Sequence, residues 1–192
     1  MAGTTFEGFS VSHAAILDGG TGAEVADIYG IREGSIEVDT DSYDNTGDDT
    51  ILSTWNWFNF ANLKITAGYV PFSVISTMTS ATITSSGTGA ATQYALPLWN
   101  EKSLNASPKP VLVRVPSKDS DGVARVFDFV LYKVQFAPIS FDGPSYRDGL
   151  VLNYAGKALM STKDEKGATL GPTHGLTTGD RAIGRLVNSQ AV

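Results

Sequence analysis

Two neighbouring segments of strand-forming residues constrain the fold more than any other feature of this sequence. Residues 111–115 read VLVRV, residues 124–136 read ARVFDFVLYKVQF, and the polar stretch 116–122 between them ends in Asp-Gly. Runs rich in Val, Phe and Tyr that flank a polar turn are typical of an antiparallel β-hairpin. Apolar residues occur at both parities of the second run, so both faces of that strand are predicted to be partly covered.

Further strands are predicted at residues 23–31, 35–39, 50–69 and 150–154, where apolar and β-branched residues recur with short periods. The segment 50–69 is expected to contain one or two strands, with a break near Ala61 and Asn62. Strict alternation along it would place Trp55 and Trp57 on one face, and Phe58 and Phe60 on the other.

One short helix is predicted at about Val70–Ser80. Pro71 suits the first helical turn, where its missing N–H costs nothing, and Val70, Val74 and Met78 form one apolar stripe. The predicted fold class is therefore mainly β: a β-sandwich or β-roll with this flanking helix and a long loop between the early strands. The predicted organisation is an N-terminal arm (1–22), a β domain (23–162) and a C-terminal arm (163–192), both arms being flexible.

The composition argues against several functions. The chain of 192 residues has a formal net charge of −6 and no cysteine, so tight binding to nucleic acid and thiolate metal sites are not expected. Its first residues show no signal-peptide pattern, which predicts a protein made and kept soluble in a cytoplasm. We find no serine-hydrolase elbow, zinc-protease motif or P-loop, so no enzyme, catalytic residue, cofactor or metal site is predicted. His13 and His174 are expected to be solvated surface residues.

The segment 39–49 reads DTDSYDNTGDD and is predicted to be an acidic loop. A loose calcium site built from its aspartates is one interpretation, but the segment lacks the spacing and the distal Glu of an EF-hand. A solvated loop that contacts a neighbouring subunit is favoured. The residues of this candidate inter-subunit or inter-ring loop are Asp39, Asp41, Tyr43, Asp44, Asp48 and Asp49.

The aromatic residues Trp55, Trp57, Phe58, Phe60 and Trp99 allow two interpretations. They would form a sugar-stacking platform if the chain were a carbohydrate-binding module. Core or interface positions are favoured, because aromatic side chains contribute most to burial in both.

Several sequence stretches together resemble major tail proteins of siphovirus-type phages, particularly those infecting actinobacteria. They are YGIREGS (29–35), the acidic segment 39–49, LSTW (52–55), NFA (59–61) and GYVPF (68–72). The resemblance implies a β-sandwich-like subunit of the tail tube that forms hexameric rings, which stack into the hollow conduit for DNA ejection. It also implies a location in the virion tail after assembly in the host cytoplasm.

The partners implied by this resemblance are other copies of the chain, the tape measure protein, the tail terminator and tail-tip proteins, with no specific nucleic-acid binding and no membrane. Tubes of this kind typically have an acidic lumen, and Glu37 and Asp128 are the candidate lumen-facing acids. Another virion structural protein, such as a capsid decoration or tail-tip subunit, is the nearest alternative.

Overall fold

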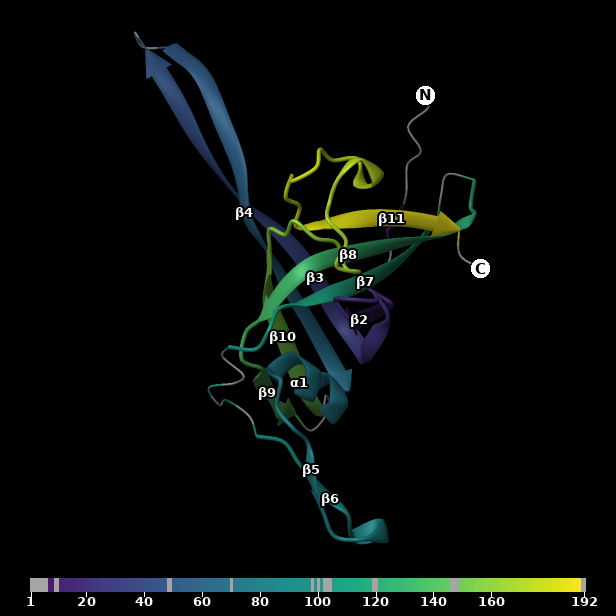
Figure 1. Ribbon diagram of the computed structural model, residues 1–192. Coiled ribbons are helices and arrows are strands. Elements are labelled where there is room, and N and C mark those ends of the chain that lie inside the picture. Colours follow the sequence, from purple (N-terminus) through teal and green to yellow (C-terminus); the bar gives the residue numbers. More distant parts are fainter. Residues whose placement is uncertain are drawn as a thin grey trace.

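The computed structural model describes residues 7–8, 11–47, 50–69, 71–97, 99, 101, 105–118, 121–145 and 149–190. These residues form antiparallel β-structure with one α-helix (Figure 1), which confirms the predicted mainly β class. The strands are β1 (Glu7–Gly8), β2 (His13–Leu17), β3 (Glu24–Gly47), β4 (Thr50–Tyr69), β5 (Thr84–Ser86), β6 (Gln93–Ala95), β7 (Lys109–Lys118), β8 (Ala124–Phe136), β9 (Ser140–Ser145), β10 (Gly149–Leu159) and β11 (Gly184–Gln190). The helix α1 spans Phe72–Thr79, and single 3₁₀ turns occur at Gly89–Ala91 and Pro172–His174.

The main sheet closes on itself. Its strands follow the order β1-β7-β2-β3-β4-β10-β8-β11, and β7 also pairs with β8 as the predicted hairpin. The strands β7, β2, β3, β4, β10 and β8 therefore form a closed antiparallel barrel, with β11 added beside β8 and β9 beside β10. Closure pairs both edges of the barrel strands over part of their length, whereas β3 beyond Ile28 pairs on one edge only among the described residues.

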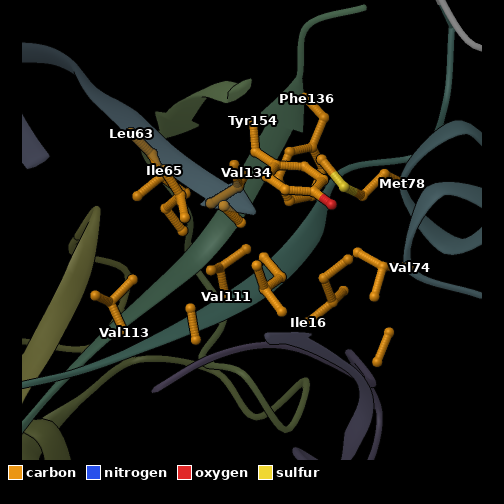
Figure 2. Packing of buried hydrophobic residues seen from close by; sticks show 14 of the residues in the cluster. Ile16, Leu63, Ile65, Val74, Met78, Val111, Val113, Val134, Phe136 and Tyr154 are labelled. Atoms are coloured by element: carbon orange, nitrogen blue, oxygen red, sulfur yellow. The ribbon is translucent and has the colours of Figure 1, made fainter. Parts of the chain in front are cut away.

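The barrel interior holds the main apolar core (Figure 2). Its fully buried members include Ile16, Leu63, Ile65, Val111, Val134 and Tyr154. Helix α1 lies within the predicted range and adds Val74 and Met78 to this core, as the apolar stripe predicted. Burial raises the pKa of Tyr154 well above its usual range.

A second, smaller apolar layer covers the outside of β2, β7 and β8. Leu112 and Val130 pack there with Leu170 of the C-terminal segment. Both faces of β8 are thus covered, as predicted. A bulge in β8 opposite Pro110 moves residues of one parity to different faces, so Val130 faces the outer layer whereas Val134 faces the barrel core.

The predicted arms are wrong for much of their length. Residues 13–17 form β2 between β3 and β7, and Ala14 and Ile16 are completely buried. The C-terminal segment covers the outer layer and returns as β11 along β8. The C-terminal segment is poor in apolar residues, and the burial of both segments depends on strands that are distant in the sequence, β7 for residues 13–17 and β8 for β11.

The predicted loop between the early strands is also wrong. The segments 23–31 and 35–39 belong to one strand, β3, which continues through the acidic segment to Gly47. No break occurs at Ala61 or Asn62, since both residues lie within β4 and pair with β3. The nearest of the register irregularities between β3 and β4 lies at Asn59, where β4 has one extra residue relative to β3.

Buried polar contacts hold the C-terminal segment in place. The Asp164 carboxylate contacts His174 through Oδ2 and Nε2, which are 3.2 Å apart. Glu165 is buried and forms an ion pair with Arg185 of β11. His174 is therefore not the solvated histidine that was predicted. The Glu165–Arg185 pair joins the segment after β10 to β11, and the Asp164–His174 contact links two parts of that segment.

Candidate assembly surface

The outer half of the β3–β4 hairpin is a two-stranded ribbon that extends beyond the barrel (Figure 1). The pairing of β4 with β10 begins at Phe60, and that of β3 with β2 ends at Ile28. Among the described strands, residues 40–47 and 50–58 therefore pair only with each other. An isolated two-stranded ribbon is marginally stable in water, so a partner surface is expected to stabilise this one.

Large apolar side chains are exposed on this hairpin. The exposed fractions are 53% for Val38, 60% for Tyr43 and 59% for Phe58. Val38 and Phe58 share one face, because Phe58 lies opposite Thr40 in the register. Exposed apolar side chains grouped on one face are typical of a protein–protein contact.

The face with Val38 and Phe58 borders an apolar groove of about 520 Å³. Ile36, Val38 and Phe58 line it from the hairpin, Phe129 from β8, and Leu186 from β11. Arg181 lies at the same groove.

Beyond Ile28, β3 pairs on one edge only among the described residues, and β11 pairs only with β8. The groove is thus flanked by two strands with open edges, which can accept a further strand.

The predicted acidic loop residues lie on this ribbon. Asp39 accepts a hydrogen bond from Asn59 Nδ2 at 3.3 Å, and Asp41 is exposed. Tyr43 lies opposite Trp55 in the register. Asp44 is part of β3, although its side chain lies outside the described structure, and Asp48 and Asp49 lie outside the described residues. An extended strand separates Asp39 from Asp41 along its length, so these two carboxylates are not wrapped around one ion as in a calcium loop.

The bulge at Asn59 separates the aromatic residues that strict alternation had grouped. Phe60 lies opposite Asp39 and Phe58 opposite Thr40, so the two rings are on opposite faces. The Lys157 ammonium lies 4.3 Å from the centre of the Phe60 ring, outside the apolar groove. Trp99 is exposed and donates from Nε1 to the Ile139 carbonyl. Phe58 and Phe60 therefore cannot belong to one flat sugar-binding platform.

The two candidate lumen-facing acids differ in their surroundings. Glu37 is exposed on the polar face of the hairpin, and it lines a hollow with Lys64 and Lys157. The Asp128 side chain is only 16% exposed and forms a bidentate ion pair with Arg114, at 2.7 Å from Nε and 2.9 Å from the terminal nitrogen. This hydrogen bonding raises the pKa of Arg114, so the charge of Asp128 is balanced within the sheet. Whether either acid faces a lumen stays a prediction.

A second ribbon, formed by β5 and β6, leaves the body on the side away from the β3–β4 tip (Figure 1). Its strand residues are all exposed, and they are mostly small and polar apart from Tyr94. The described chain thus projects in two opposite directions from one barrel.

No protein-family model and no curated protein matches this chain. Within the described residues, no helix is long and apolar enough to cross a membrane.

Proposed function

We propose that this chain is a structural, non-enzymatic subunit of a phage tail tube that assembles with copies of itself into stacked, hexameric rings. The observation that carries the proposal is the β3–β4 ribbon, which projects from a closed barrel with apolar side chains uncovered. A subunit that functions alone gains nothing from such a ribbon, because it exposes apolar surface and open strand edges to water.

The shape of the body supports head-to-tail contacts. A contact between two different surfaces of one chain generates a ring if its rotation closes, and a further contact along the axis generates a stack. The two ribbons leave the barrel in opposite directions (Figure 1), so one subunit can reach copies on both sides. The open edges beside the groove offer the strand pairing that would join neighbours within a ring.

The charge of the chain supports a role as a conduit. A net charge of −6 repels the phosphate backbone, which favours the passage of DNA over its retention. Within the proposed virion tail, the tape measure protein, the tail terminator and tail-tip proteins would be the further partners.

Replacing Phe58 with aspartate tests whether the groove face is an assembly contact. Phe58→Asp should raise the protein concentration needed for assembly at least about tenfold, because a buried, unpaired carboxylate costs more than about 1.4 kcal/mol. Light scattering against protein concentration measures this change. Val123→Asp, at the exposed β7–β8 turn, introduces the same charge outside the β3–β4 hairpin. This variant should assemble normally. Equal assembly of the two variants would exclude the groove face from the contact.

A further inference from the structure

Three side chains with metal-binding atoms meet on the outer face of β2 and β3, at the base of the hairpin. His13 Nε2 lies 3.4 Å from Glu24 Oε2 and 3.9 Å from Asp27 Oδ1. The three donor atoms all lie within 4.8 Å of one another. Donor atoms around a tetrahedral zinc ion with bonds of about 2.0 Å are about 3.3 Å apart, so small side-chain movements would close the set.

A bulge in β3 creates this cluster. Asp27 pairs with Ala15, whereas Glu24 pairs with Leu17 because Val25 is an extra residue in β3. In a regular strand, residues 24 and 27 would point to opposite faces. The bulge places both carboxylates on the face that carries His13, which is two residues before Ala15.

One carboxylate oxygen of the cluster, Asp27 Oδ1, lacks a hydrogen-bond donor among the described residues. Asp27 Oδ1 is shielded from solvent and accepts no hydrogen bond from the described residues. The other oxygen, Oδ2, accepts a hydrogen bond of 3.0 Å from the Tyr29 hydroxyl, which fixes the orientation of the carboxylate. A buried anionic oxygen without a donor is costly, and a cation beside it removes that cost.

The arginine next to the cluster is already paired with another carboxylate. Arg114 lies beside His13, since the two residues pair across β2 and β7. Its guanidinium is engaged by Asp128 in the bidentate ion pair. The cluster therefore has two carboxylates and an imidazole, with the adjacent positive charge already balanced.

We propose that His13, Glu24 and Asp27 bind a divalent transition-metal ion of the zinc class. One imidazole nitrogen and two carboxylate oxygens are suitable ligands for such an ion, and water would complete its coordination. Tyr29 is a positioning residue that holds Asp27 through its second oxygen. The bound ion would tie β2 to the start of β3, and so fix the base of the projecting hairpin to the barrel. The proposal is independent of the tail-tube function.

Isothermal titration of the full chain with zinc chloride at about pH 7 tests the site. Wild-type protein should bind one zinc ion saturably, and its thermal unfolding temperature should rise with zinc concentration. His13→Gln and Asp27→Asn should each weaken binding at least about tenfold. His174→Gln, which changes the only other histidine, is the matched control and should leave zinc affinity unchanged.

A measurement on the unaltered protein guards against variants that fail to fold. The imidazole proton signal of His13 in the NMR spectrum should shift on adding zinc, while that of His174 should not. Acidification should weaken the effect, because a proton competes with the ion for the imidazole. Absence of saturable zinc binding, or an unchanged affinity in a folded His13→Gln variant, would overturn the proposal.

Discussion

Shortening the β3–β4 hairpin should abolish assembly and leave the barrel folded. Residues 42–56 can be replaced by Asn-Gly, because Asp41 lies opposite Trp57 and a two-residue turn closes that pair without changing the register. The barrel pairs of β4 with β10 begin at Phe60 and remain intact. The variant keeps Val38 and Phe58 but lacks the outer ribbon with Tyr43, so copies lose the projecting part of the surface through which they are proposed to meet.

Electron microscopy and sedimentation of the shortened protein measure this outcome. The expected result is a monomer with a β-type circular-dichroism spectrum and cooperative thermal unfolding. Loss of the folded signal would instead show that the barrel needs the outer ribbon in order to fold. Assembly of the shortened chain at wild-type concentrations would contradict the proposed role of the hairpin.

Removing the Asp164 carboxylate should strongly destabilise the packing of the C-terminal segment. Asp164 is 8% exposed, and its Oδ1 accepts hydrogen bonds from the backbone N–H groups of Lys166 at 2.9 Å and Ala168 at 2.8 Å. Its Oδ2 contacts His174 at 3.2 Å. Asp164→Ala leaves these donors unsatisfied, so we expect a loss of about 2–4 kcal/mol in the free energy of unfolding. Urea denaturation measures it.

The control for this substitution is Asp180→Ala. Asp180 is exposed and accepts one backbone hydrogen bond from Thr177, at 2.9 Å. Its removal should cost less than about 1 kcal/mol, because solvent replaces the lost contact. Equal losses in the two variants would show that burial of Asp164 adds nothing to the stability of the fold.

The same carboxylate should make stability depend on acidity. Burial alone would raise the pKa of Asp164, but the backbone hydrogen bonds and His174 outweigh it and lower the pKa. Between the lowered folded value and the unfolded value of about 3.9, the unfolded state binds more protons, so stability rises with pH. The contribution of Asp164 is therefore present above about pH 4 and is lost as pH falls through the folded pKa. Asp164→Ala should unfold with a shallower pH dependence in this acidic range.

The elements that depend on local pattern were predictable from the sequence. The β7–β8 hairpin follows from two apolar runs around a turn, and α1 follows from Pro71 and the apolar stripe that includes Val74 and Met78. Their packing partners were not predictable. Residues 13–17 pair with β3, which follows them directly, and with β7, which comes from a distant part of the chain.

Bulges limited the prediction of the sites. The extra residue at Asn59 separates Phe58 from Phe60, and the extra residue at Val25 brings Glu24 to the face of Asp27. A bulge arises from pairing with the partner strand, so alternation within one strand does not reveal it. The acidic segment was predicted as a candidate contact, but its Asp and Gly content favoured a loop over the extended strand that residues 39–47 form.

Negative-stain electron microscopy of the purified protein, across increasing protein and salt concentrations, tests the proposed function most directly. The account predicts rings of six subunits and hollow tubes made by their stacking, with the β3–β4 ribbon at the contacts between copies. A protein that stays monomeric at the highest concentrations, by both microscopy and sedimentation, would contradict a self-assembling tube subunit.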